Sequence, residues 1–378
     1  MKRLLSLLFC ALFAVSLCGC SNKAPGGEHD FTTPISSATA ANEYKPRGSY
    51  KMIIPPDGYI PENPEESETP RPAAPLPAAT GAFWISGTKL VDANGNEFVM
   101  RGINHAHVWY KDELETALDG IAATGANCVR IVLADGDQWE RVTPAELQRV
   151  IEECAKRKLI MIAEFHDATG KDDQVPLDNA VSCWIELKDV LNAYSDKVIL
   201  NIANEWLGGW DADKWKAGYT AAIPRLREAG ITNTIMVDAA GWGQYGESIK
   251  TAGKAVFDSD PDRNTMFSIH MYGTAGKDAA TITAGLKGAT DQDLCVIVGE
   301  FGYNHSDGDV DEAFIMKYCA ENSIGYIGWS WKGNSGGVEY LDIARDWRGE
   351  ALSEDWGAVL VNGENGIKAT SKICSIFE

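Results

Sequence analysis

Two glutamates, Glu205 and Glu300, are the residues of this chain best placed to do chemistry, because each follows a short apolar run. The runs at residues 198–203 and 295–298 have the composition of strands buried on both faces, as in a parallel sheet. Acidic groups at the carboxyl ends of barrel strands lie where α/β barrels keep their catalytic residues. The two glutamates are 300 − 205 = 95 residues apart, far apart in sequence, but they would be adjacent in a closed barrel. Two carboxyl groups facing each other across one cleft are what glycoside hydrolysis requires.

Other polar and aromatic side chains fall at or near the ends of the apolar runs, and Arg130 lies within the second run. A barrel with a purely structural role would not need them at the same end of successive runs. Because these ends meet on one rim of a barrel, we expect them to form a single site. In chain order the candidates are Asn104, His105, His107, Trp109, Tyr110, Arg130, His166, Asp167, Asn204, Trp242, His270, Tyr272, Trp329 and Trp331.

The elements that must position these residues alternate between strand-like and helix-like patterns. Eight strand-length apolar runs separated by amphipathic segments predict a (β/α)8 TIM barrel. A doubly wound sheet would instead show a glycine-rich phosphate loop after an early strand, and the sequence has none. The predicted strands are residues 98–104, 128–133, 159–165, 198–203, 234–238, 266–271, 295–298 and 325–329. The predicted helices are residues 112–124, 144–158, 177–194, 212–228 and 310–322.

A short β-hairpin is expected just before the barrel, at residues 83–99. Its turn signal is Asn94-Gly95, a pair that favours tight hairpin turns. We expect this hairpin to plug one end of the barrel.

The charge and aromatic content limit the classes of partner. The formal net charge is 34 − 54 = −20, and the sequence has no cluster of Lys and Arg. Such an acidic chain is a poor partner for nucleic acid or anionic lipid, whereas a neutral polysaccharide is compatible with it. Twelve Trp and twelve Tyr offer flat faces for sugar rings, although most are expected to fill the core.

No cofactor or metal is expected. His105 and His107 lie two residues apart, hence on one face if both are in a strand, but an open zinc site needs a third ligand and none is evident nearby. The cysteines have no metal-binding spacing. Apart from Cys10 and Cys18 in the leader segment and Cys20 directly after it, six remain, namely Cys128, Cys154, Cys183, Cys295, Cys319 and Cys374. One or two disulfides are compatible with an exported protein, but Cys128 and Cys295 read as small buried apolar residues.

The amino terminus predicts export. Met1-Lys-Arg3 is followed by an apolar run at residues 4–17, too short to span a bilayer and long enough for a signal peptide. Leu17-Cys-Gly-Cys20 then resembles a bacterial lipobox, which predicts a signal peptide at residues 1–19 and a lipid on Cys20. An ordinary secretory signal with incidental cysteines is the alternative.

Residues 20–80 are expected to form a flexible tether, because they contain eleven of the fifteen prolines. The catalytic domain is then residues 81–378, and the lipid is the sole membrane contact.

Nine stretches of the chain resemble glycoside hydrolase family 5, and more closely its bacterial endo-β-1,4-mannanases. The likeness extends over about residues 83–378, and the last two stretches point to mannan rather than cellulose. The stretches are RGINHAHVWYKD at 101–112, GANCVRIVL at 125–133, EFHDATG at 164–170, NIANEW at 201–206, MVDAAGWGQ at 236–244, RNTMFSIHMY at 263–272, VGEFG at 298–302, GWSWKGN at 328–334 and VEYLD at 338–342.

The resemblance implies a retaining mechanism with Glu205 as the general acid/base and Glu300 as the nucleophile. Arg130 would help to keep Glu300 charged, although it could be only an interior salt-bridge residue. Tyr272 would donate a hydrogen bond to Glu300. Asn204 suits the 2-hydroxyl of the sugar, and Glu164 reads as a buried, paired barrel residue.

The remaining implied contacts are with the substrate, a β-mannan polysaccharide. His166 and His270 would hold further polar edges of the sugar, and Trp329 would form the stacking floor at the cleaved bond. Trp109, Trp206, Trp242 and Trp331 are candidates for neighbouring subsites.

Three alternatives remain at this point. A β-1,4-glucanase of the same family would use the same residues on a different polysaccharide. A non-catalytic glycan-binding lipoprotein would most simply lack one of the two glutamates, and this sequence keeps both. A solute-binding lipoprotein would need two α/β lobes, whereas the repeats here run continuously.

If Cys20 carries the lipid anchor, the Cys20→Ala variant should be found in the soluble rather than the membrane fraction. Fractionation of cells producing each form, followed by immunoblotting, measures this. Unchanged membrane association of the variant would contradict the lipobox assignment.

Overall fold

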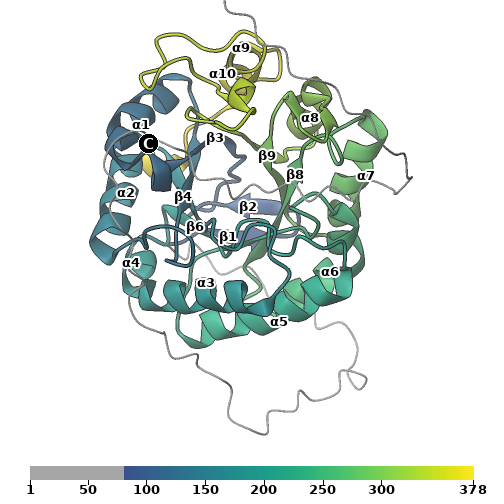
Figure 1. Cartoon of the computed structure of the whole chain (residues 1–378). Coiled ribbons are helices and arrows are strands. Elements are labelled where there is room, and N and C mark those ends of the chain that lie inside the picture. The colour runs from purple at the N-terminus through teal and green to yellow at the C-terminus, as the bar shows by residue number, and fades with distance from the viewer. Residues whose placement is uncertain (1–80) are drawn as a thin grey trace, which may run out of the picture. The chain divides into compact units, whose positions relative to one another are not determined.

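The computed structural model describes residues 81–378, which form a closed barrel of eight parallel strands surrounded by helices (Figure 1). The barrel closes because β12 pairs with both β3 and β9. This confirms the (β/α)8 prediction. In their order around the barrel the strands are β12 (Gly325–Gly328), β3 (Arg101–His105), β4 (Cys128–Leu133), β5 (Ile160–Phe165), β6 (Val198–Asn201), β7 (Ile235–Asp238), β8 (Thr265–Met271) and β9 (Val296–Phe301). The predicted signal peptide, lipidated cysteine and tether lie outside the described residues.

Helices follow the strands and lie around the outside of the barrel (Figure 1). The principal helices are α1 (Leu114–Ala123), α2 (Pro144–Lys156), α3 (Gln174–Glu186), α4 (Lys188–Ala193), α5 (Ala212–Glu228), α6 (Gly246–Asp258), α7 (Ala279–Thr290) and α8 (Glu312–Glu321). Two short helices near the carboxyl terminus are α9 (Gly357–Asn362) and α10 (Ile367–Thr370). The 3-10 turns are η1 (His107–Trp109), η2 (Lys111–Glu113), η3 (Glu339–Leu341) and η4 (Ser375–Phe377).

Local sequence signals explain where several helices begin. Thr143 caps α2 by accepting a hydrogen bond from the Glu146 N–H, and Pro144 occupies the first turn. Asp211 caps α5 in the same way, and α5 has the bounds predicted for it. The helix predicted at residues 177–194 is in fact two helices, α3 and α4, which meet at Leu187. Helices α6 and α7 were not predicted.

A β-hairpin closes the amino-terminal end of the barrel, as predicted. Its strands are β1 (Trp84–Ser86) and β2 (Lys89–Val91), and Phe83 and Ile85 pack in one apolar cluster with inward residues of the barrel strands such as Ile162. The predicted turn is wrong, because the hairpin turns at Gly87-Thr88. Asn94-Gly95 instead forms a second tight turn, in which the Gly95 N–H bonds to the Asp92 carbonyl.

Six cysteines are present in residues 81–378, and all six are free and buried. No disulfide therefore forms among the described residues, where each thiol packs as a small buried side chain. None of the helices in this part of the chain is long and apolar enough to cross a bilayer.

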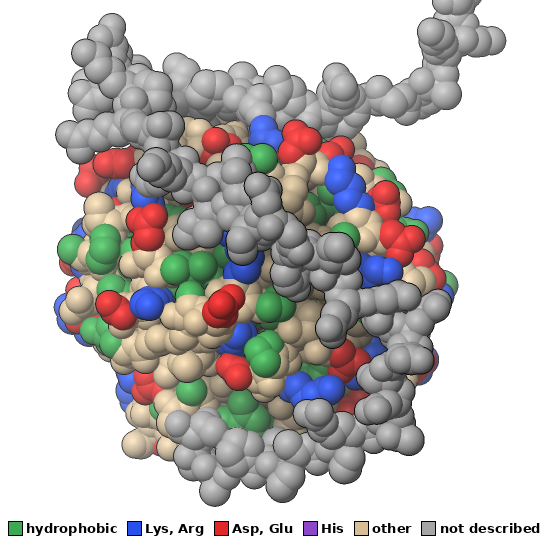
Figure 2. Space-filling model, turned by 90° about the horizontal axis from the view of Figure 1, so that it is seen from below, with side chains coloured by type: hydrophobic (Ala, Val, Ile, Leu, Met, Phe, Trp, Pro, Cys, Tyr) green, Lys and Arg blue, Asp and Glu red, His purple; other side chains and the backbone are tan. Residues whose placement is uncertain are grey.

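The surface carries charges of both signs. On the face seen in Figure 2, Lys and Arg side chains are interspersed with Asp and Glu rather than gathered into a basic patch. Several of the surface pairs, such as Arg149 with Glu115 at 3.0 Å, are more than half exposed and contribute little to stability.

One ion pair at the amino-terminal end of the barrel is buried. Arg227 near the end of α5 forms two parallel hydrogen bonds with Asp260, at 2.9 and 3.0 Å. The Arg227 guanidinium also donates to the carbonyls of Ile231, Asn233 and Asn264, so its polar atoms are well satisfied. Burial opposes ionisation of Asp260, but the hydrogen bonds from Arg227 outweigh it and lower the pKa of this carboxyl.

The Arg227→Ala variant should lose about 3–5 kcal/mol of unfolding free energy, because it leaves the Asp260 carboxylate buried without its partner. Chemical denaturation measures this loss. The matched control is Arg149→Ala, which removes an exposed pair and should cost less than about 1 kcal/mol. Equal losses in the two variants would contradict this account of the buried pair.

Candidate active site

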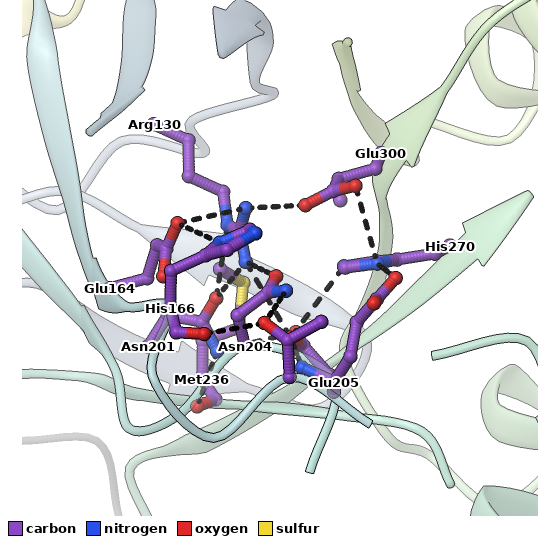
Figure 3. Close-up of polar contacts among 12 residues, drawn as sticks. Arg130, Glu164, His166, Asn201, Asn204, Glu205, Met236, His270 and Glu300 are labelled. Atoms are coloured by element: carbon purple, nitrogen blue, oxygen red, sulfur yellow. Dashed lines mark hydrogen bonds and ion pairs between the residues drawn. The ribbon is translucent and has the colours of Figure 1, made fainter. Parts of the chain in front are cut away.

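The carboxyl ends of β6 and β9 bring Glu205 and Glu300 together. Glu205 lies in the turn after β6, and Glu300 lies within β9 (Figure 3). A carboxylate oxygen of each and a ring nitrogen of His270 all lie within 4.8 Å of one another. Both glutamates are nearly buried, at 8% and 3% exposure, so they face a restricted volume rather than open solvent.

Backbone and side-chain contacts fix Glu205. Its φ of 47° is in the left-handed region, an unusual conformation for a glutamate. Its N–H donates to the Asp238 carboxylate at 3.0 Å, and its carbonyl accepts from the Gly170 N–H at 3.2 Å. The side-chain Oε1 contacts His270 Nδ1 at 2.7 Å. These three anchors hold the unusual turn and aim the carboxyl group at the site.

Glu300 is held by a cation and a hydroxyl. Arg130 donates to its Oε1 at 2.7 Å, and the Tyr272 hydroxyl donates to its Oε2 at 2.9 Å, both as predicted from the resemblance. The prediction for the pKa of Glu300 is only partly right. Arg130 and His270 act to lower this pKa, but burial raises it by more, and the charge of Glu205 raises it further.

Arg130 is the centre of the polar network (Figure 3). The guanidinium is fully buried and contacts Glu300, Glu164 and Asp238, the last two at 3.6 and 3.5 Å. It also donates to three amide oxygens, those of Asn104, Asn201 and Asn204. Arg130 is thus an interior salt-bridge arginine and a neighbour of the reacting carboxylate at once.

His270 is a second buried cation. Burial lowers the pKa of its ring, but the carboxylates of Glu300, Asp238 and Glu205 outweigh burial and raise it to about 10. Burial likewise opposes ionisation of Asp238, and the charges of His270 and Arg130 lower the Asp238 pKa to about 2. At neutral pH these positive and negative groups therefore stabilise one another.

Aromatic side chains form a wall beside the carboxylates. His166 stacks on Trp329 with ring centroids 5.8 Å apart. It contacts Trp109 edge-on at 5.3 Å and Trp139 at a tilt at 5.9 Å. His166 Nδ1 is paired with Glu164 at 3.0 Å, so the Glu164 prediction of a buried, paired residue is correct. Trp329 is half-buried, and its indole N–H donates to Asn334 at 3.0 Å.

Two predicted subsite residues are corrected. Trp206 and Trp331 are fully buried, with no surface that a sugar could stack on. The Trp206 indole N–H donates to the Asp173 carbonyl, and that of Trp331 donates to the Trp347 carbonyl. Both side chains are therefore core residues, packed in the main hydrophobic cluster. Trp242 is partly exposed and lies over Gly170, where an added Cβ would come within 2.1 Å of its ring.

The amide of Asn204 is already engaged within the protein. Its Oδ1 accepts from Arg130 at 2.7 Å, and its Nδ2 donates to the Thr169 hydroxyl at 2.9 Å. A sugar 2-hydroxyl that binds Asn204 would therefore have to share Oδ1 with Arg130 or Nδ2 with Thr169.

His105 and His107 do not share a strand face. His105 ends β3, whereas His107 begins the 3-10 turn η1, and their ring centroids are 6.0 Å apart. Burial lowers the pKa of His105 to about 3, so this ring stays neutral. His107 Nε2 lies 3.4 Å from Glu146, outside the catalytic cluster.

Sequence reasoning missed three residues of the site, namely Asp238, Asn201 and Trp139. Asp238 ends an apolar strand as Glu300 nearly does, so the same signal could have found it. Asn201 lies inside an apolar run, and only its contact with Arg130 shows its role. Trp139 lies in a loop, where its edge-on contact with Trp109 at 5.1 Å has no sequence signal.

Glu205, His270 and Glu300 are also the residues with the spacing that a metal ion would need, among those the structure describes. The raised pKa of His270, about 10, works against that use, because a protonated ring has no lone pair to donate. The arrangement instead suits proton transfer and nucleophilic attack by two close carboxyl groups.

The barrel and its paired carboxyl groups define a glycoside hydrolase. Comparison with family models agrees, because the model described as "Cellulase (glycosyl hydrolase family 5)" matches residues 91–335. The chain belongs to glycosyl hydrolase family 5.

Named relatives and solved structures carry mannanase names. The chain is 52% identical over 295 residues to a mannan endo-1,4-beta-mannosidase of Salipaludibacillus agaradhaerens, covering 78% of this chain and 96% of that one. It is 42% identical to an enzyme of the same name from Streptomyces lividans, over 79% of each chain. The mannohexaose complex of the Thermomonospora fusca beta-mannanase is similar at a TM-score of 0.74 and 42% identity, covering 79% of this chain and 99% of that one.

The charge pairing of His270 predicts a specific pH dependence of stability. Because its folded pKa of about 10 exceeds the ordinary 6.5, its contribution is complete below about pH 6.5 and is lost as pH rises through 10. Melting temperatures of the wild type and His270→Asn should therefore converge between these limits. A difference that stays constant from pH 6.5 to 10 would contradict a protonated His270.

Proposed function

We propose that this protein is an endo-acting, retaining β-1,4-mannanase. The observation that carries the proposal is the closeness of Glu205 and Glu300, since one carboxylate oxygen of each lies within 4.8 Å of the other. Retaining glycosidases hold their two carboxyl groups about 5–5.5 Å apart, whereas inverting enzymes leave about 6.5–9.5 Å for a water molecule. The substrate class rests on the names of the relatives, which are mannan endo-1,4-beta-mannosidases.

In the first step, a Glu300 oxygen forms a bond to the anomeric carbon while the glycosidic bond breaks. Glu205 gives its proton to the departing oxygen, which leaves as the new chain end. In the second step, Glu205 takes a proton from water, and the resulting hydroxide displaces Glu300 from the anomeric carbon. Both carboxyl groups return to their starting states, and the anomeric configuration is retained after two inversions.

The contacts around the glutamates fit these roles. Arg130 and Tyr272 each donate to one oxygen of Glu300, so they orient it and can stabilise it again when it leaves as a carboxylate. His270 donates from Nδ1 to Glu205 at 2.7 Å and so fixes the orientation of this carboxyl group. Trp329 stands beside His166, where its ring can support the sugar at the cleaved bond.

A β-1,4-glucanase remains the second candidate. It is favoured by the name of one relative, the beta-mannanase/endoglucanase A of Caldicellulosiruptor saccharolyticus, which is 41% identical over 279 residues. A non-catalytic glycan-binding protein fits less well, since both glutamates keep the hydrogen bonds that catalysis would need.

We further propose that the protein is exported and anchored to a bacterial membrane or cell surface through a lipid on Cys20. The support is the apolar leader at residues 4–17 and the lipobox that follows it. The proline-rich segment up to residue 80 would then separate the barrel from the membrane.

Hydrolysis of linear mannan, glucomannan and carboxymethylcellulose by the purified wild type tests the substrate class. We expect activity on the two mannose-containing polymers to exceed that on cellulose. Anomers followed by NMR early in the reaction should show a β-configured product. Preference for carboxymethylcellulose would support the glucanase, and an α-configured product would contradict the retaining mechanism.

Glu205→Ala and Glu300→Ala should each lose at least about 10²–10⁴-fold in kcat on mannan, because one removes the proton donor and the other the nucleophile. The matched control is Glu321→Ala, a change to an exposed glutamate at the end of α8 that should leave kcat unchanged. Near wild-type hydrolysis by either site variant would end the assignment of these residues.

A further inference from the structure

Trp210 is the exposed aromatic residue that the proposed mechanism leaves unexplained. It is 53% exposed, and the other large apolar residues with comparable exposure in the described part of the chain are the aliphatic Val175 and Ile373. Exposing an indole to water is unfavourable, and single exposed residues are common. Exposure alone therefore does not indicate a binding site. The contacts around the Trp210 ring show whether it is held in an orientation that a ligand could bind.

The Trp210 ring is held in one position by its neighbours. Gly241, with a φ of +63°, lets the backbone approach so closely that an added Cβ would lie 2.9 Å from the ring. Tyr245 packs against the ring with centroids 5.0 Å apart and planes at 62°. One side of the indole is thus supported by protein while more than half of the residue stays exposed, which is a preorganised platform.

A hollow of about 460 Å³ continues from Trp210 between α6 and α7. Gly246 of α6 and Gly285 of α7 approach each other closely, because a Cβ on Gly246 would lie 3.1 Å from the Gly285 Cα. Small residues, including Ala284 and Gly288, keep the hollow open, and polar side chains border it. An aromatic platform beside a shallow hollow with polar edges suits a sugar chain, which has apolar ring faces and hydroxyl groups at its rim.

The loop that carries Trp210 is connected to the catalytic cleft. The Gly241 N–H donates to the Gly209 carbonyl at 3.1 Å, and the Trp242 N–H donates to the Leu207 carbonyl at 3.4 Å. Trp242 covers Gly170, whose N–H donates to the Glu205 carbonyl at 3.2 Å. Platform, partly exposed Trp242 and proposed acid/base are therefore joined by short contacts.

The position along the cleft follows from the proposed roles. In the proposed function, Trp329, which stacks on His166, supports the sugar that Glu300 attacks. Glu205 gives its proton to the departing oxygen, so the leaving part of the polymer passes on the side of Glu205 and Trp242. Trp210 belongs to the same segment between β6 and α5 as Glu205, so we place it farther along that side.

We infer that Trp210 and the hollow between α6 and α7 bind the leaving-group part of a β-1,4-linked mannan chain, several sugars away from the cleaved bond. This inference rests on the proposed function. It identifies an additional polysaccharide-binding site and predicts that the enzyme favours long chains over short ones.

The test compares a polymer with a substrate that has no sugar on the leaving-group side, such as an aryl β-mannobioside. Trp210→Ala should raise the KM for linear mannan about 3- to 10-fold, as expected for the loss of one stacked sugar, and leave the aryl substrate unchanged. Trp210→Tyr keeps a flat ring and should remain close to wild type. Ile373→Ala removes an equally exposed apolar side chain elsewhere and is the matched control.

A second variant tests the hollow without touching Trp210. Ala284 is exposed on α7, so Ala284→Gln should fold normally, partly fill the hollow and raise the KM for mannan alone. Unchanged KM values for mannan in both variants, or equal losses on mannan and the aryl substrate, would overturn the site. Failure of the wild type to hydrolyse mannan would instead refute the proposed function itself.

Discussion

The burial of the Arg130 guanidinium is the constraint on which the rest of the site depends. A cation that is fully removed from water must find acceptors for its donors, since an isolated buried charge is too costly to keep. Arg130 finds them on three other strands, at Asn104, Asn201 and Glu300, and in the turn that contains Asn204. Satisfying one side chain therefore fixes the relative positions of several barrel strands at their carboxyl ends.

His270 is a second buried cation, and its charge is likewise compensated by buried acidic groups. Four acidic groups surround the two cations, and each is placed by a different strand or turn, namely Glu164, Asp238, Glu205 and Glu300. Excess negative charge in this cluster raises the pKa of His270 and gives Glu205 a charged donor. The cluster is thus a balanced arrangement in which removing any one member leaves another group without compensation.

The two ends of the barrel have different roles: the amino-terminal end stabilises the fold, and the carboxyl-terminal end carries the candidate active site. The amino-terminal end is filled by the hairpin β1–β2 and by apolar side chains such as Phe83, and the Arg227–Asp260 pair is buried nearby. The carboxyl-terminal end has polar residues in the interior and aromatic residues around them. In the proposed function, the wall of Trp329 and His166 supports the attacked sugar, and Trp242 and Trp210 extend the contact surface toward the departing chain.

The sequence alone was enough to predict the barrel, its hairpin and the position of the two glutamates at strand ends. Local apolar patterns indicate which segments are buried strands and where those strands end. Asp238 could have been predicted as a site residue in the same way, because it also ends an apolar strand. Tertiary structure decided which aromatic residues keep some exposed surface. Trp206 and Trp331 look like Trp242 in sequence, yet of these three only Trp242 is partly exposed. Tertiary structure also decided that Trp139 joins the wall and that Asn201 serves Arg130. Exposure and partnership depend on what other segments pack against a residue, and no local pattern contains that information.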